Sequence, residues 1–275
     1  MTKTALVTGA SSGIGEETAR TLHQLGYTVY AAARRTDRLQ KLANGGIHAL
    51  AMDVTDDKSM TSGIDSIIAE TGRIDVLVNN AGYGSYGAIE DVPLDEARRQ
   101  FEVNLFGLGR LTQLVLPHMR AQKFGTIINI SSMGGRLTTP LGGWYHATKY
   151  AVEALSDALR METAPFGINV VVIEPGGIRT EWSGIAADHL EETAEGSAYA
   201  SQIKAVANSM RSESTNNRQS PPSVIADTVE KIVTARKPRT RYVVGFAAKP
   251  LVTLRRILPD RAFDRVISAA LGVRR

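Results

Sequence analysis

Short apolar runs alternate along the chain with longer amphipathic segments. The runs are rich in Val, Ile, Leu and Ala and are bounded by turn residues, as is typical of buried strands. Between them, apolar residues recur at helical spacing. This alternation predicts an α/β fold with one doubly wound parallel sheet of about seven strands and helices on both faces. The expected strands are 4–8, 28–33, 47–52, 74–79, 126–130, 169–173 and 242–244.

The pattern predicts a single domain over residues 1–275. Helices are expected at 13–25, ended by Gly26, and at 57–71. A long helix should run from about 95 to 120, bent near Pro117. Residues from about 181 to 220 are expected to form a loop over the substrate. Residues from about 250 to 275 are predicted to be a basic amphipathic extension of one or two helices.

Composition excludes several kinds of chemistry. The chain has 275 residues and no cysteine, so disulfide and thiolate chemistry are excluded. Its five histidines show no metal-ligand spacing, and we predict no metal site. No apolar run is long enough to predict a membrane span, and the N-terminus lacks a signal-peptide pattern. We therefore expect a cytoplasmic protein.

The positive charge is concentrated at the C-terminal end. Residues 236–275 contain 11 Lys/Arg and 2 Asp/Glu, whereas the whole chain has a net charge of +4. A basic tail can indicate an acidic partner. However, these basic residues are spread among apolar ones, without an aromatic stacking platform or a nucleic-acid motif, so nucleic acid is not an expected partner. Contact of this tail with a membrane surface is an alternative that we do not favour.

A glycine-rich turn joins the first expected strand to the first helix. It has the spacing Gly-x-x-x-Gly-x-Gly between Thr8 and Gly15. Glycines let a backbone approach a pyrophosphate, and a helix N-terminus offers free N–H groups. A glycine turn can also be purely structural, but its position favours a nucleotide site in a Rossmann-type domain. The residues expected at the cofactor are Gly9, Ser11, Ser12, Gly13, Ile14 and Gly15.

The end of the second expected strand indicates which dinucleotide binds. NAD sites usually place Asp or Glu there to bind the ribose. Here Ala33 occupies the acidic position, and Arg34 and Arg35 follow. A guanidinium suits a 2′-phosphate by charge and by forked hydrogen bonding. We therefore predict NADP(H) as the cofactor, the alternative being that these arginines only face solvent.

Tyr145 and Lys149 lie four residues apart in an expected helix, so both point from one face. A nearby ammonium favours phenolate, and we expect Lys149 to lower the pKa of Tyr145 from about 10 toward neutrality. Such a pair can serve as a proton donor. The spacing alone also occurs by chance, so the rest of the chain must supply the partners of this pair.

Together these motifs resemble the short-chain dehydrogenase/reductase family, in the order in which that family carries them. The resemblance is firm over about residues 3–180. The segment PLGGWYHATKYAVEALSDALRMETAPFGI most resembles the 17β-hydroxysteroid-dehydrogenase-like branch, which also favours NADP(H). The matching positions are Thr8 to Gly15, Asp53-Val54, Asn79-Asn80-Ala81-Gly82, Asn104, Ser131-Ser132, Tyr145, Lys149 and Pro175 to Thr180.

The resemblance implies a catalytic role for four residues. Tyr145 would be the general acid in reduction and the base in oxidation. Lys149 would also bind the nicotinamide ribose. Ser132, 13 residues before Tyr145, would hydrogen-bond the substrate oxygen as charge develops on it. Asn104 would hold a water in a proton relay to Lys149.

The resemblance also implies further cofactor contacts. Asp53 and Val54 would contact the adenine, and Asn80 would lie along the adenosine side. Ile178 and Thr180 would hold the carboxamide. The remaining implied cofactor residues are Ala81, Gly82, Tyr145, Lys149, Pro175 and Gly176.

The expected substrate pocket is mainly apolar. Gly134, Leu141 and Trp144 lie between Ser132 and Tyr145 and should wall it. Trp182 should begin the loop that closes over the substrate. These side chains predict a lipophilic carbonyl or secondary alcohol, such as a steroid, a retinoid or a similar compound. Each of them could instead be ordinary packing.

We therefore predict an NADP-dependent oxidoreductase that acts on a small-molecule carbonyl or alcohol. One alternative is a reductase of 3-oxoacyl thioesters on acyl carrier protein. Another is an NADP-sensing regulator without catalysis, against which the four intact catalytic positions argue. Members of the family that this chain resembles usually assemble through the long helix and the tyrosine-bearing helix. The resemblance therefore implies a homo-oligomer, either a dimer or a tetramer.

Overall fold

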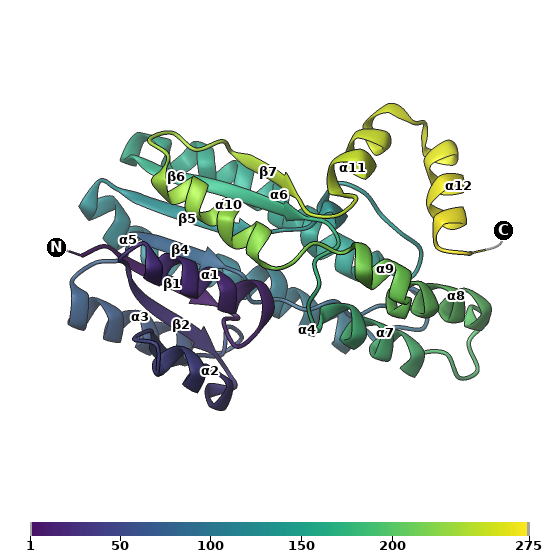
Figure 1. Cartoon of the computed structure of the whole chain (residues 1–275), viewed down its shortest axis with the longest axis horizontal. Helices are drawn as coiled ribbons and strands as arrows, with labels where there is room; N and C mark the ends of the chain where they lie inside the picture. The colour runs from purple at the N-terminus through teal and green to yellow at the C-terminus, as the bar shows by residue number, and fades with distance from the viewer. Residues whose placement is uncertain (1, 274–275) are drawn as a thin grey trace.

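Seven parallel strands form one sheet in the computed structural model, which describes residues 2–273 apart from the side chains of Ser214 and Asn216. The strand order is β3-β2-β1-β4-β5-β6-β7 (Figure 1). The predicted fold class is therefore confirmed. The strands are β1 (Thr4–Thr8), β2 (Thr28–Ala33), β3 (His48–Ala51), β4 (Val76–Asn79), β5 (Gly125–Ile130), β6 (Ile168–Pro175) and β7 (Arg241–Val244).

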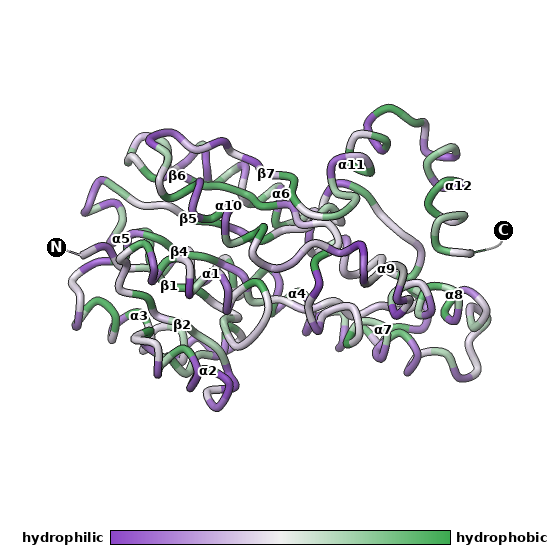
Figure 2. The backbone as a smooth tube through the Cα atoms, viewed as in Figure 1, coloured by the Kyte–Doolittle hydropathy of each residue, from purple (hydrophilic) through white to green (hydrophobic). Residues whose placement is uncertain are grey.

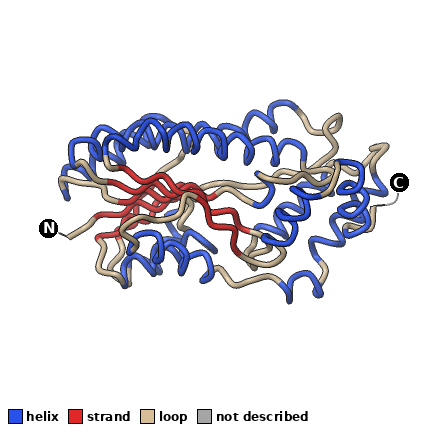
Figure 3. Tube along the Cα trace, turned by 90° about the horizontal axis from the view of Figure 1, so that it is seen from above, coloured by secondary structure: helices blue, strands red, loops and turns tan. Residues whose placement is uncertain are grey.

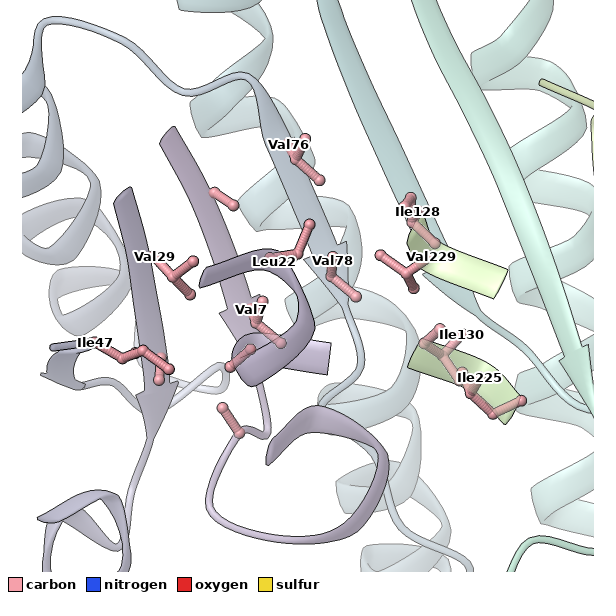
Figure 4. Close-up of a cluster of buried hydrophobic side chains, with 14 of the residues drawn as sticks. Val7, Leu22, Val29, Ile47, Val76, Val78, Ile128, Ile130, Ile225 and Val229 are labelled. Carbon is pink, nitrogen blue, oxygen red and sulfur yellow. The ribbon is translucent and has the colours of Figure 1, made fainter. Parts of the chain in front are cut away.

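Helices cover both faces of the sheet, because its central strands are apolar on both sides (Figures 2 and 3). Side chains such as Leu22, Ile225 and Val229 fill one face (Figure 4), and Ile64, Leu111 and Val115 fill the other. The first face is covered by α1 (Gly13–Gln24), α2 (Thr36–Ala43) and α10 (Ser223–Thr234), and the second by α3 (Asp57–Thr71), α5 (Gly107–Gln122) and α6 (Gly143–Thr163).

The strand order reverses next to β1, which pairs with β2 on one side and β4 on the other. In an open parallel sheet, such a reversal opens a crevice beyond the carboxyl ends of the strands. The loops that follow β1, β4, β5 and β6 all leave the sheet at this edge. These loops carry nearly all of the predicted site residues, so the topology brings distant motifs together.

The predicted long helix is interrupted. It consists of α4 (Leu94–Phe101), a π-helical turn η1 (Glu102–Phe106) and α5, and Pro117, where a bend is predicted, lies inside α5. A π turn changes the direction of the side chains that follow, and such turns are frequent at functional sites. Asn104 lies in this turn and is buried.

The predicted loop at 181–220 is wrong, because this region is mostly helical. It contains α7 (Trp182–Glu192), α8 (Ala200–Arg211) and α9 (Glu213–Arg218). The buried apolar residues of this region recur at helical spacing, so the sequence did contain a helical pattern among its polar residues. They are Ala186, Ala187, Leu190, Ile203, Val206 and Ala207.

The C-terminal extension forms two helices, as predicted: α11 (Ala248–Ile257) and α12 (Asp260–Ala270). Their apolar faces pack on Leu137, close to the crevice, through Val252, Phe263 and Ile267. Hydrophilic and hydrophobic residues alternate along both helices (Figure 2). Within residues 2–273, no helix combines the length and the apolar character needed to cross a membrane.

Candidate active site

A cavity of about 680 Å³ lies at the carboxyl edge of the sheet. The loops after β1 to β6 contribute to its lining, and α7, α8 and Leu271 close it on the side away from the sheet. Of the predicted site residues, Ser11, Ser12, Gly13, Ile14, Val54, Ala81, Gly82, Gly134, Pro175, Gly176, Ile178 and Thr180 all line it.

The glycine loop is held against the loop after β4. Gly9 has φ +63°, and a Cβ atom there would come within 2.8 Å of Ala81 Cα. Only glycine combines this backbone conformation with such a close approach. Asn80 donates hydrogen bonds from Nδ2 to the carbonyl oxygens of Thr8 (2.9 Å) and Gly9 (3.2 Å). Asn80 therefore orders the loop expected at the pyrophosphate.

Two arginines directly follow β2, beside the glycine loop. Arg34 and Arg35 both line the cavity and are exposed. Arg35 donates to Ser11 Oγ at 3.5 Å. Asp53 also lines the cavity, and its Oδ1 accepts hydrogen bonds from Thr55 N and Oγ1. This end of the cavity therefore has two exposed guanidinium groups beside the glycine loop, an arrangement that suits a phosphate.

Tyr145, Ser132 and Lys149 come together deep in the cavity. Tyr145 and Lys149 lie on α6 and are both 7% exposed, so little water reaches them. Lys149 Nζ donates to the Ile130 carbonyl at 3.0 Å and lies 5.9 Å from the centre of the Tyr145 ring. Ser132, just after β5, hydrogen-bonds Tyr145 and accepts from Gly134 N at 3.0 Å. The three predicted polar groups therefore share one site.

The expected lowering of the Tyr145 pKa is wrong for this structure. Burial raises the pKa of Tyr145 to about 12, and only the hydrogen bond with Ser132 opposes this. Burial also lowers the pKa of Lys149 to about 8, against the attraction of Glu153. Desolvation disfavours the charged form of each group. Tyr145 is therefore a protonated phenol near neutral pH, the form that a proton donor needs.

Asn104 is predicted to be catalytic, and it lies behind the cavity without lining it. Its Oδ1 accepts from Tyr83 N, and its Nδ2 donates to Tyr83 O and to Thr148 Oγ1, one residue before Lys149. Both ends of the amide are thus engaged with the protein. The side chain therefore ties the loop after β4 to α6.

Three other predicted contacts do not line the cavity: Gly15, Leu141 and Trp144. Gly15 packs against the backbone of Gly9, where a Cβ would come within 2.4 Å of its carbonyl oxygen. Leu141 packs with Tyr86 and Tyr145 in a buried cluster. Trp144 precedes Tyr145 by one helical position, which turns it about 100° away from the face that carries the phenol.

Trp182, predicted to begin a loop over the substrate, begins the helix α7 and lines the cavity. Its ring lies 5.3 Å from that of Tyr145 and 5.9 Å from that of Tyr86. Leu271 and Met210 line the same cavity, although the sequence analysis did not single them out. Both follow polar or basic stretches far from the motifs, so only packing brings them here. His146, also on the wall, was missed beside Tyr145.

Comparisons with known proteins identify the family of this chain. The short chain dehydrogenase family matches residues 3–190. A 3-ketodihydrosphingosine reductase from Bacteroides thetaiotaomicron is 35% identical over 270 residues, 98% of each chain. An NADPH-dependent 3-dehydrocapnine reductase from Ornithobacterium rhinotracheale is 35% identical over 275 residues, 95% of each chain.

Solved structures agree as well. A short-chain dehydrogenase from Streptomyces avermitilis has a TM-score of 0.81 and 33% identity, covering 99% of this chain and 96% of that one. A metagenomic short-chain oxidoreductase in complex with NADP has a TM-score of 0.69 and 27% identity, covering 88% and 96%. The chain therefore belongs to the short-chain dehydrogenase/reductase family, the oxidoreductases that act on alcohols and carbonyls.

Proposed function

We propose that this enzyme reduces a lipophilic carbonyl compound with NADPH, or oxidises the corresponding secondary alcohol with NADP. The observation that carries the proposal is the group of buried Tyr145 and Lys149 with half-buried Ser132, set between a glycine loop with two arginines and a wall of apolar side chains. The nicotinamide supplies the hydride when bound. Tyr145 gives its phenolic proton to the substrate oxygen, and Ser132 hydrogen-bonds that oxygen as negative charge develops.

NADP(H) is the cofactor that the electrostatics favour. Ala33, at the end of β2, offers no carboxylate to a ribose hydroxyl, and Arg34 and Arg35 line the cavity next to it. Two similar proteins point the same way, since one is named an NADPH-dependent reductase and another was solved with NADP. The remaining assigned contacts, with Asp53 and Val54 at the adenine and Ile178 and Thr180 at the carboxamide, belong to this proposal.

Arg34→Ser is expected to weaken NADPH binding about 10- to 100-fold and NADH binding little. The reason is that a charged hydrogen bond to the 2′-phosphate contributes about 1.5–3 kcal/mol, and NADH has no such phosphate. Fluorescence titration with each cofactor measures this. Arg38→Ser serves as a matched control, because Arg38 is paired with Glu181 and does not line the cavity. An equal loss for both cofactors would place the phosphate contact elsewhere.

The substrate assignment rests on the inner wall of the cavity. Tyr86, Leu137, Trp182, Met210 and Leu271 surround the position facing Tyr145. Arg136 does not line the cavity and is paired with Glu174, a buried carboxylate. Two similar proteins are named as a 3-ketodihydrosphingosine reductase and an NADPH-dependent 3-dehydrocapnine reductase. We keep the likeness to the 17β-hydroxysteroid-dehydrogenase-like branch as a second substrate class.

A substrate panel tests the function. Long-chain 3-oxo amines, a steroid ketone, a retinal and a 3-oxoacyl thioester are each supplied with NADPH, and oxidation of the nicotinamide is followed by absorbance. We expect turnover with the lipophilic ketones and kcat/KM rising with chain length, because each buried CH₂ contributes about 0.8 kcal/mol. Preference for the thioester would support the carrier-protein alternative. Cofactor binding without turnover on any carbonyl would support the regulator.

We further propose that the chain forms a homo-oligomer through η1, α5 and α6. Large apolar side chains on η1 and α6 are exposed, with Phe106 at 55%, Leu155 at 39% and Met161 at 64%. Exposed apolar patches of this kind mark interaction surfaces. Light scattering should give the mass of at least two chains, and Phe106→Asp should shift it toward one. A single-chain mass for the unaltered protein would contradict the proposal.

A further inference from the structure

His146 occupies an unusual position beside the catalytic tyrosine. It follows Tyr145 on α6 and is 3% exposed. Its Nδ1 lies 3.0 Å from the Gly134 carbonyl oxygen, and its Nε2 lies 3.0 Å from both the backbone nitrogen and the hydroxyl of Thr139. Both ring nitrogens therefore contact the segment that joins Ser132 to Tyr145, the two groups that face the substrate oxygen.

These contacts determine the protonation of the ring. The backbone N–H of Thr139 can only donate, so Nε2 must carry a lone pair. The Gly134 carbonyl can only accept, so Nδ1 must carry the proton. The neutral Nδ1–H tautomer alone satisfies both partners. A protonated ring would turn a second N–H toward the Thr139 N–H and lose that hydrogen bond.

The ring fits closely between two glycines of the same segment. A Cβ atom at Gly134 would come within 2.8 Å of His146 Nδ1, and one at Gly142 within 2.7 Å of His146 Nε2. Real Cβ contacts are not this short, so any side chain at either position would displace the imidazole. The segment is therefore shaped around the ring, and the hydrogen bonds are not a chance result of packing.

Gly134 connects this ring to the serine. Its N–H donates to Ser132 Oγ at 3.0 Å while its carbonyl accepts from His146. Accepting from Gly134 uses one lone pair of Ser132 Oγ and leaves the hydroxyl proton available to the reacting oxygen beside Tyr145. We propose that His146 is a positioning residue, which in its neutral Nδ1–H form holds Gly134 and Thr139 so that the Ser132 hydroxyl points at the reacting oxygen. This inference rests on the proposed carbonyl reduction.

Acid should therefore inactivate the enzyme through His146. Burial lowers the pKa of its imidazole, although the hydrogen bond to Gly134 opposes this. Among the described residues, the titratable groups that face the ring are the phenols of Tyr145 on α6 and Tyr86 in the loop after β4. Burial raises the pKa of both phenols, so neither is charged below neutrality. The segment around Gly134 and Thr139 contributes only uncharged groups to the ring.

Two substitutions separate the hydrogen bonds from the titration. His146→Phe keeps an aromatic ring but neither hydrogen bond, and we expect kcat to fall about 10- to 100-fold, less than removal of an oxyanion donor itself. The Kd for NADPH should change less than threefold, since the cofactor contacts remain. His146→Gln keeps one donor and one acceptor and cannot titrate, so it should recover part of kcat and lack the acid limb of the pH–rate profile. Circular dichroism and thermal melting check that each variant is folded.

His48→Gln is the matched control, because His48 is exposed on β3 and pairs with Glu70 far from the cavity. It should keep both kcat and the acid limb. An unchanged kcat in folded His146→Phe, or an acid limb in His146→Gln equal to that of the unaltered enzyme, would overturn the inference.

A spectroscopic test does not depend on activity. Long-range ¹⁵N–¹H NMR of protein labelled at histidine reports which ring nitrogen carries the proton, and the spectrum of His146→Gln assigns the signal. We expect the Nδ1–H tautomer at neutral pH, and an Nε2–H or charged ring would contradict the proposal. If no carbonyl compound is turned over but this tautomer is found, the proposed function fails, while the hydrogen bonds of His146 with Gly134 and Thr139 are supported.

Discussion

Tyr145→Phe is expected to lower kcat for carbonyl reduction about 10²- to 10⁴-fold, because it removes only the phenolic proton that completes the alcohol. The ring is buried among Tyr86, Trp182 and Leu141, and phenylalanine preserves those contacts. The Kd for NADPH should therefore change little. Steady-state kinetics and fluorescence titration measure the two effects separately.

Tyr150→Phe is the control for this substitution. Tyr150 lies on the same helix, five residues on, and is 42% exposed. Its variant should keep kcat within about twofold, as is usual for exposed positions away from special contacts. If Tyr145→Phe retained a kcat close to that of the unaltered enzyme, Tyr145 could not be the proton donor.

Ser132→Ala is expected to lower kcat about 10²- to 10³-fold, the usual cost of losing one hydrogen bond to a developing oxyanion. It should also raise the pKa of Tyr145 further, because the hydrogen bond with Ser132 is what opposes the effect of burial. The pH–rate profile for alcohol oxidation, which needs the phenolate, should shift to higher pH. Initial rates across the pH range measure both changes.

Ser131→Ala makes the matched comparison. The two serines are adjacent, but Ser131 is 3% exposed and its hydroxyl has no hydrogen-bond partner in the described part of the chain. Replacing it should leave kcat within a few-fold. Equal losses in the two variants would indicate that Ser132 acts through local packing and not through its hydroxyl.

The strands and most of the motifs could be predicted because their signals are local. A run such as Thr4–Thr8 is buried throughout and apolar at its three central positions, since both faces of a parallel strand are covered. The glycine loop was predictable because the backbone conformation of Gly9 requires that residue type. Helical spacing placed Tyr145 and Lys149 on one face, and the surrounding motifs gave the pair its expected role.

Burial changed the expected chemistry of that pair. Sequence spacing suggested that the Lys149 charge would dominate the Tyr145 pKa, but both groups are almost fully covered and desolvation dominates instead. Burial depends on which residues pack over the site from α7 and from the C-terminal end, such as Trp182 and Leu271. Spacing along one helix carries no information about those distant segments.

The amino-acid sequence by itself determined the class of fold and the glycine loop, and it singled out Tyr145 and Lys149 as candidate reacting groups, because each of these signals depends on residues within a few positions of one another. Tertiary structure alone decided which side chains wall the cavity, why Asn104 and Trp144 lie outside it, and how His146 spans Gly134 and Thr139. These contacts join distant segments through side-chain packing and hydrogen bonds, which form only when the chain has folded.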